Sequence, residues 1–235
     1  MYLKRKRMSK HKDIQEKLGI SFSNEALLEE ACTHRSFVNE HPEYKGNHNE
    51  RLEFLGDAVL ELVVTEFLFS MYPSYDEGTL SGVRAWIVNT QSLAKSAESL
   101  HLDMFLRTSK GEEATKGKDS LRANMLEAIF GALYLDRGYE QVKEVITTLL
   151  LQDVDTIIKQ QHYRDPKSVF QEKAQEEFRK TPTYMVVKQS GPDHDKLFVV
   201  SVYIGDKEIA QGEGSSKQEA ETNAARTGMY VFKKT

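Results

Sequence analysis

The strongest pattern of hydrophobic and polar positions lies between His48 and Met71, and it predicts one long helix with two different faces. Apolar side chains recur at steps typical of a single helix face: Leu52, Leu55, Val59, Leu62 and Val63. Carboxylates recur at steps of three and four residues on a second face: Glu50, Glu53, Asp57 and Glu61. Pro73 disfavours helical backbone in the residue before it, so the helix should end near Met71.

The row of four carboxylates has two interpretations. Like charges one turn apart repel by a few tenths of a kcal/mol per pair, so the row is either a solvated acidic face or a set of oxygen donors for a divalent cation. Gly56 lies within the row, where glycine costs about 1 kcal/mol relative to alanine. A glycine there indicates close approach of another backbone or a ligand. The two features together favour the cation site.

A second helix with similar features is expected over about residues 121–136. Asn124 and Glu127 share one face at a spacing of three residues, and Gly131 is again a glycine in mid-helix. Its apolar face consists of Leu126, Ile129, Phe130 and Leu133. No segment before residue 159 shows the alternation of a strand. Further helices are expected over residues 13–32, 80–88, 92–100 and 142–158. Gly19 should break the first of them, and Asn89 and Thr90 should form the turn and cap before the third.

The pattern changes after about residue 159, which indicates a second domain. The expected boundaries are a helical domain over 9–158, a polar linker over 159–164 and a small domain over 165–234. The small domain reads as helix, three strands and helix, at residues 168–179, 183–189, 197–204, 207–213 and 216–232. Ser216 and Glu219 form a capping box at the start of the last helix. We therefore expect an α+β domain with two helices on one face of an antiparallel sheet.

Length, charge and cysteine content exclude several classes of protein. A chain of 235 residues allows one or two domains, and a net charge of −4 excludes a strongly basic protein but not a local basic surface. A single cysteine, Cys32, excludes an internal disulfide and fits a reducing compartment, so we expect a cytoplasmic protein. No apolar run is long enough to span a bilayer, so no membrane partner is expected.

Two regions resemble one known family. Residues 49–57, NERLEFLGD, resemble the signature of ribonuclease III. Residues 165–232 resemble a double-stranded RNA-binding domain through several short motifs: Asp165-Pro166-Lys167, Gln171-Glu172, Gly191-Pro192, Gly212-Glu213-Gly214 and Lys217-Gln218-Glu219-Ala220. In this order they resemble bacterial ribonuclease III, which implies an all-α catalytic domain followed by an α-β-β-β-α RNA-binding domain.

The resemblance implies a Mg²⁺ site, at which Mn²⁺ could substitute. The family's signature helix supplies two acids, which correspond to Glu53 and Asp57. A second helix supplies an Asp-x-x-Glu pattern, which here reads Asn124 to Glu127. Asp57 and Glu127 are thus expected as catalytic residues, and Glu53, Asn124 and Glu127 as metal ligands. Asn124 departs from the family pattern, because its amide offers an oxygen without the charge.

The resemblance also implies a substrate and an assembly. Ser168, Gln171 and Glu172 would face one minor groove of double-stranded RNA, His194 the next, and Lys217 the phosphates. The family forms a homodimer in which the signature helix packs against its twin, with Phe54 near the contact. Packing in the core of one chain is the alternative for Phe54.

Three functions are weighed. The leading one is a Mg²⁺-dependent endoribonuclease that cuts double-stranded RNA to 5′-phosphate products with staggered ends, in rRNA and mRNA processing. The second is a dimer that binds such RNA but cuts it poorly, because Asn124 replaces an acid. The third is a helical interaction protein without nucleic acid. Glu53, Asp57 and Glu127 favour the first over the third, and Asn124 alone separates the first from the second.

Overall fold

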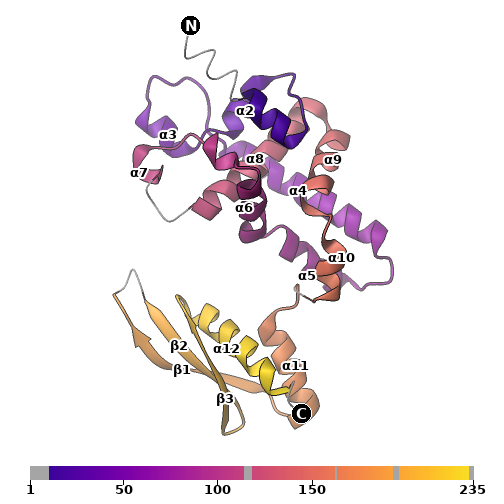
Figure 1. The fold of residues 1–235 in the computed structure, drawn as a ribbon, viewed down its shortest axis with the longest axis vertical. Helices are drawn as coiled ribbons and strands as arrows, with labels where there is room; N and C mark the ends of the chain where they lie inside the picture. Colours follow the sequence, from indigo (N-terminus) through magenta and orange to yellow (C-terminus); the bar gives the residue numbers. More distant parts are fainter. Residues whose placement is uncertain (1–10, 114–117, 162, 193–195, 233–235) are drawn as a thin grey trace. The chain divides into compact units, whose positions relative to one another are not determined.

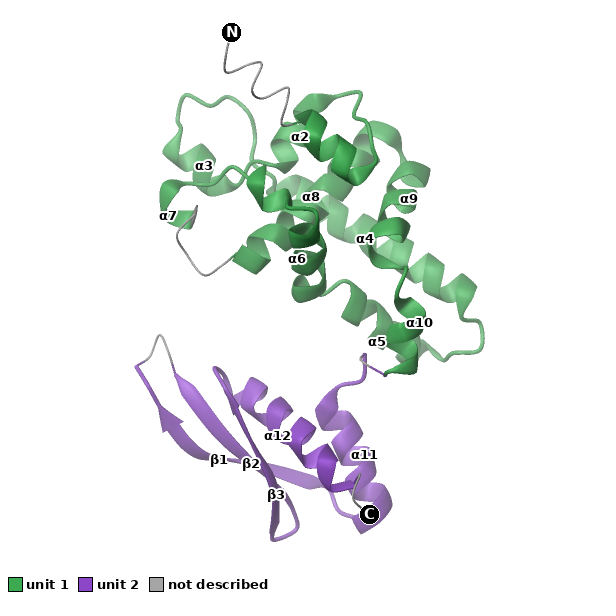
Figure 2. Cartoon of the chain, viewed as in Figure 1, with its two compact units in different colours: residues 1–160 green, residues 161–235 purple. Residues whose placement is uncertain are grey.

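The computed structural model describes residues 11–113, 118–161, 163–192 and 196–232, and it divides the chain into two compact units (Figure 2). Unit 1 covers Met1–Gln160, and the regular structure of its described residues consists of helices apart from one isolated bridge between Thr33 and Arg107. Unit 2 covers Gln161–Thr235 and combines two helices with a sheet (Figure 1). The expected order of an all-α domain and an α+β domain is confirmed.

Unit 1 is built around two long helices that pack against each other, α4 and α8. Helix α6 lies against α8, and the apolar face predicted for α8 is fully buried there. After a helical segment over residues 11–18, the elements are α2 (Glu25–Ala31), α3 (Arg35–Glu40), α4 (Glu50–Met71), α5 (Glu77–Ile87), α6 (Thr90–Ser99), the 3₁₀ turn η1 (Leu102–Met104), α7 (Lys110–Glu113), α8 (Lys118–Arg137), α9 (Tyr139–Leu150) and α10 (Val154–Lys159). None of the helices in the described part of the chain has the length and apolar character needed to cross a bilayer.

Side-chain caps fix where several of these helices begin. The Asn89 side chain accepts a hydrogen bond from the Ser92 N–H at 2.8 Å, as the sequence predicted for α6. The Asp76 carboxylate caps α5 by accepting from the Thr79 N–H at 2.7 Å. This cap starts α5 three residues before the predicted position.

The single helix predicted over residues 142–158 is wrong, because the structure has two helices there, α9 and α10. Val142, Val145 and Ile146 are buried along one face of α9, whereas Leu151, Val154 and Ile158 are buried after the break. At 100° per residue, one continuous helix would turn the second set of side chains about half a turn away from the first. The break at residues 151–153 lets both sets face the core. Helix α3 is a further difference, since no helix was predicted for it.

Unit 2 follows the predicted order closely. Its elements are α11 (Pro166–Phe178), β1 (Pro182–Ser190), β2 (Leu197–Ile204), β3 (Lys207–Gly214) and α12 (Lys217–Phe232). The strands pair antiparallel in the order β1-β2-β3, with Val202 opposite both Tyr184 and Ala210. Both helices pack on one face of the sheet around Phe170 and Val202 (Figure 1). The predicted cap is present, because the Ser216 hydroxyl accepts from the Glu219 N–H at 3.1 Å.

Candidate active site and RNA-binding surface

The residue before the acidic helix is anchored in the core of unit 1. Asn49 is 1% exposed, its N–H donates to the Thr33 carbonyl at 2.8 Å, and its amide nitrogen donates to the Ala31 carbonyl at 3.4 Å. These bonds tie the start of α4 to the segment that follows α2. The row of acids therefore begins at a fixed point, Glu50.

Two glycines let α4 and α8 cross with their backbones in direct contact. A Cβ atom added at Gly56 would lie 1.8 Å from the carbonyl oxygen of Glu127. One added at Gly131 would lie 2.2 Å from the carbonyl oxygen of Leu52. No side chain fits at either position, which is the close backbone approach that Gly56 predicted.

The crossing brings the predicted acids of the two helices together. Glu53 and Asp57 lie on either side of Gly56 in α4, and Glu127 of α8 faces Gly56 with its backbone. Burial, followed by the negative charges of Asp57 and Glu53, raises the pKa of Glu127 from 4.5 to about 7. Glu127 thus lies within electrostatic reach of both acids of α4.

Asn124 takes part in the same cluster. Burial first, and then the charge of Glu50, raise the pKa of Glu53; the charge of Asp57 adds to the rise. A hydrogen bond between the side chains of Glu53 and Asn124 works in the opposite direction and lowers the pKa of Glu53. Since a carboxylate is only an acceptor, the Asn124 amide nitrogen is the donor. The asparagine thus stabilises the ionised form of Glu53 without adding a charge of its own.

The two outer acids of the α4 row differ from the inner ones, because each has an arginine partner. Glu50 lies 3.6 Å from Arg35 and 3.7 Å from His48, and Glu61 lies 2.9 Å from Arg84. Within the described ranges, no ion pair of 4.0 Å or less joins Glu53, Asp57 or Glu127 to a cation. Excess negative charge is therefore concentrated at the crossing of the two helices.

The donor set of the crossing suits a hard cation. Three carboxylates and one amide oxygen are the ligand types that Mg²⁺ and Mn²⁺ bind. As the side chains stand, no three Asp, Glu, His or Cys groups in the described residues are near enough to share an ion. Because the glycine contact fixes the two backbones, sharing one ion requires rotation of the side chains themselves.

The predicted RNA-binding residues of unit 2 lie at the starts of its two helices. Ser168, Gln171 and Glu172 are exposed at positions i, i+3 and i+4 of α11, and thus on one face. Lys217 is exposed at the first residue of α12, where the helix end favours an anion. Glu172 forms an ion pair with Arg164. His194 lies outside the described residues.

One stripe of α4 carries exposed apolar side chains. Phe54 is 81% exposed, Leu62 57% and Phe69 75%. Core packing of Phe54, the alternative left open by the sequence, is therefore excluded for the single chain. Leu62, which the spacing places on one apolar face with Val63, points outward: it lies about 80° around the helix from Phe54 and about 100° from Val63, which is fully buried.

The comparisons with known proteins agree with this layout. A sequence model described as ribonuclease-III-like matches residues 24–154, and one for the double-stranded RNA binding motif matches residues 166–229. Ribonuclease 3 of Natranaerobius thermophilus is 45% identical over 224 residues, which are 94% of this chain and 95% of that protein. Ribonuclease 3 of Wolinella succinogenes is 43% identical over 227 residues, with 96% and 93% covered.

A solved structure of the nuclease domain of ribonuclease III from Campylobacter jejuni matches unit 1. The TM-score is 0.54 at 44% identity, and the match covers 58% of this chain and 93% of that domain. The family resemblance of the sequence is thereby confirmed for both units. The chain belongs to the ribonuclease III family of endoribonucleases.

Proposed function

We propose that this endoribonuclease cuts double-stranded RNA with Mg²⁺ held by Glu53, Asn124 and Glu127, and with Asp57 beside the ion. One observation supports this site above all: the Gly56–Gly131 contact brings carboxylates of two helices together without a cationic side chain to balance them. A divalent ion would supply that balance and would be shared by α4 and α8. Mn²⁺ has the same ligand preference and would substitute.

The side chains at the crossing would have two roles, ion binding and orientation of the reactants. Glu53, Glu127 and the amide oxygen of Asn124 would hold the ion, and Asp57 and Glu127 would orient the reacting water and phosphate. When bound, the ion neutralises charge on the phosphodiester oxygens and increases the acidity of the attacking water. Glu127 has a pKa raised to about 7, so near neutral pH it exchanges a proton easily and must lose it to bind the ion.

Unit 2 would deliver the substrate. A double-stranded RNA binding motif reads the duplex mainly by shape, through 2′-hydroxyls and phosphates over about 16 base pairs. Ser168, Gln171 and Glu172 would contact a minor groove, and Lys217 the phosphates. His194 would contact the next minor groove, and this part of the proposal rests on the sequence alone. Only one lysine, Lys217, starts α12, so the salt dependence of binding should be shallow.

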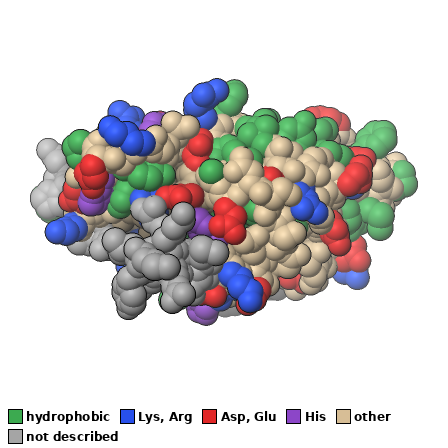
Figure 3. All heavy atoms as spheres, turned by 90° about the horizontal axis from the view of Figure 1, so that it is seen from above, with side chains coloured by type: hydrophobic (Ala, Val, Ile, Leu, Met, Phe, Trp, Pro, Cys, Tyr) green, Lys and Arg blue, Asp and Glu red, His purple; other side chains and the backbone are tan. Residues whose placement is uncertain are grey.

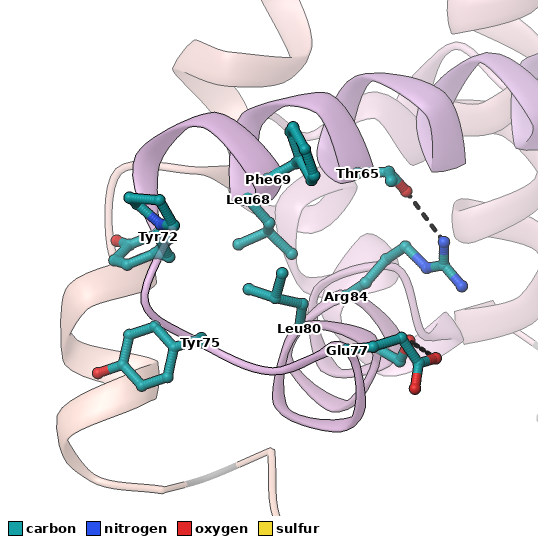
Figure 4. A pocket seen from close by; sticks show the side chains of 10 residues that line it. Thr65, Leu68, Phe69, Tyr72, Tyr75, Glu77, Leu80 and Arg84 are labelled. Carbon is teal, nitrogen blue, oxygen red and sulfur yellow. Dashed lines mark hydrogen bonds between the residues drawn. The ribbon is translucent and has the colours of Figure 1, made fainter.

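We further propose that two copies associate through the exposed stripe of α4. Phe54, Leu62 and Phe69 are the large exposed side chains of the α4 stripe. Figure 3 shows that hydrophobic side chains gather on part of the surface seen there. A pocket of about 550 Å³ adjoins this stripe; Leu68 and Phe69 line it from α4 and Leu80 from α5 (Figure 4). A region of the Campylobacter jejuni nuclease domain is described as involved in dimer formation, which supports the same arrangement here.

Such a dimer would present one site to each RNA strand. Two cuts would then leave staggered ends with 5′-phosphates, as in rRNA and mRNA processing in the cytoplasm. Sedimentation of the parent chain should give a dimer, and Phe54→Asp should give a monomer, because an exposed charge replaces the apolar contact. Dimers of both proteins at micromolar concentration would contradict this surface. Lys207→Asp, in the small domain, is the control for an added charge.

The function is tested with a long RNA duplex and a matching DNA duplex, each with Mg²⁺ or with EDTA. We expect cleavage of RNA only with Mg²⁺, and retention of the RNA on a gel with EDTA. Cleavage in EDTA would show that the reaction does not need a divalent ion. Retention without cleavage under either condition would favour the second candidate function.

That second candidate, a duplex-binding dimer that cuts poorly, is favoured by one observation. Asn124 brings no charge to the site and donates its amide to Glu53. The Asn124→Asp variant should therefore need less Mg²⁺ for half-maximal cleavage and cut about tenfold faster at limiting Mg²⁺. Equal Mg²⁺ dependence of the two proteins would mean that the asparagine causes no defect.

A further inference from the structure

Arg122 lies on the side of α8 that faces away from the acidic crossing. Its guanidinium bridges three carboxylates from three elements: Glu98 of α6 at 3.1 Å, Asp103 of η1 at 3.5 Å and Asp119 of α8 at 3.6 Å. The Arg122 side chain is 14% exposed, although its partners are 45–69% exposed. One mostly buried cation thus joins the first turns of α8 to two neighbouring elements.

The position of Arg122 along α8 links it to the site. Asn124 follows two residues later and Glu127 five residues later, which turns their side chains about 160° and 140° around the helix axis from Arg122. Helix α8 therefore has Arg122 toward α6 and η1, and the site residues toward α4. The rotation of the first turns of α8 about the helix axis, and their position along it, determine where the oxygens of Asn124 and Glu127 lie.

Helix α8 has its backbone contacts with α4 at two points, both after Arg122 in the chain. Glu127 meets Gly56 and Gly131 meets Leu52, and these two α8 residues lie about 8 and 13 Å along the axis from Arg122. Both contacts are on one side of α8 and C-terminal to Asn124. Arg122 supplies an attachment on the opposite face, N-terminal to Asn124 and Glu127.

We propose that Arg122 is a positioning residue for the metal site, which locks the first turns of α8 so that Asn124 and Glu127 meet the acids of α4. This inference rests on the proposed metal-dependent function. Ion pairs with exposed carboxylates contribute little to stability, so the effect should appear in geometry more than in folding. The charges that raise the pKa of Glu53 are those of Glu50 and Asp57, and the charges that raise the pKa of Glu127 are those of Asp57 and Glu53. Arg122 therefore acts through position.

The test compares Arg122→Met and Arg122→Lys with the parent chain. Methionine removes the charge together with the buried Nε atom, which has no hydrogen-bond partner within the described structure, so the fold should be retained. Mn²⁺ binding is measured on the intact, RNA-free protein by electron paramagnetic resonance. We expect the Mn²⁺ dissociation constant to rise about tenfold in Arg122→Met and less in Arg122→Lys, which keeps the charge but loses the planar fork.

Two further measurements separate positioning from simple loss of stability. The Mg²⁺ concentration for half-maximal cleavage should rise by the same factor, while retention of duplex RNA in EDTA stays at the parent level. Lys143→Met is the matched control, since it removes a different inter-helix ion pair, with Glu66 at 3.1 Å. It should change the melting temperature as little as Arg122→Met does, and it should leave Mn²⁺ binding at the parent level.

Parent-like Mn²⁺ binding by Arg122→Met would overturn the inference. If that variant does not fold, Glu98→Gln and Asp103→Asn remove the partners instead at exposed positions, and together they should weaken Mn²⁺ binding several-fold; no change would overturn the inference. A parent chain that binds no Mn²⁺ and cuts RNA in EDTA would instead refute the proposed function, and this inference with it.

Discussion

The acids at the α4–α8 crossing of unit 1 differ from two acids of unit 2 in their partners. In unit 2, Glu221 pairs with Lys167 at 2.5 Å across α12 and α11, and Glu172 pairs with Arg164. At the α4–α8 crossing of unit 1, Glu127 instead meets two more carboxylates, which help to raise its pKa to about 7. Unit 2 balances these charges internally, whereas unit 1 holds an excess that an added cation would balance. The comparison teaches that the acids at the crossing, unlike the two paired acids of unit 2, leave negative charge for a cation to balance.

The largest effect that would sharpen this comparison is expected for Glu127→Gln. Removing one charged ligand at the crossing should reduce cleavage at saturating RNA by about a thousandfold, because several kcal/mol of charge stabilisation is lost. Glu221→Gln, in unit 2, should cut at the parent rate under the same conditions. Single-turnover cleavage of a labelled duplex measures both. Similar losses in the two variants would break the comparison.

Gly56→Ala should give the next largest effect. Its Cβ would lie 1.8 Å from the Glu127 carbonyl oxygen, so α4 and α8 must separate, at a cost of about 3 kcal/mol in the free energy of unfolding of unit 1. The unfolding of unit 2 should not change. Gly111→Ala is the control, because a Cβ there meets nothing within 4 Å. Urea unfolding followed separately for each unit measures these effects, and equal stability of the two variants would contradict the crossing.

A smaller effect concerns pH and the metal-free protein. The pKa of Glu127 is raised from 4.5 to about 7 in the folded state, so folding favours its protonated form. This contribution to stability is complete below pH 4.5 and is lost as the pH rises through 7, which amounts to at most about 3 kcal/mol. Glu127→Gln should therefore be more stable than the parent at pH 8 and equally stable at pH 4.

Thermal unfolding at the two pH values in EDTA measures this difference. Added Mg²⁺ should reduce the difference at pH 8, since it stabilises the ionised carboxylate of the parent only. A variant that is less stable than the parent at pH 8 would contradict the electrostatic account of the crossing.

The smallest effect is expected in unit 2, for Lys217→Gln. Loss of one phosphate contact should lower the slope of log affinity against log salt by roughly 0.7–0.9 and weaken RNA binding several-fold. Cleavage at saturating RNA should stay at the parent rate. Lys207→Gln, at the first residue of β3, is the control. A reduced maximal rate in Lys217→Gln would mean that the two units do not divide binding and chemistry as proposed.

Local signals in the sequence predicted much of this fold. The bounds of β2 and the end of α4 agree with the structure, because alternation and a proline act over a few residues. Gly56 predicted a close backbone approach, since its cost within a helix needs a tertiary reason. The two halves of the acidic site could be predicted only as separate helices, and the family resemblance joined them.

Features that depend on distant partners were not predictable. The break between α9 and α10 is set by which side chains the core buries, and the pattern of residues 142–158 alone reads as one helix. Leu62 fits an apolar helix face by spacing, but only the packed structure shows that it points outward. The bridge from Arg122 to Glu98 and Asp103 spans about 20 residues without a local motif, so no sequence signal could have identified it.

The central claim is that acids from α4 and α8 share one divalent ion. A crystal of this chain soaked with Mn²⁺ and measured for anomalous scattering tests it most directly. We predict one strong peak within about 2.5 Å of carboxylate oxygens from both helices, Glu53 or Asp57 on one side and Glu127 on the other. A peak held by one helix only, or carboxylates that stay apart at saturating Mn²⁺, would contradict the account.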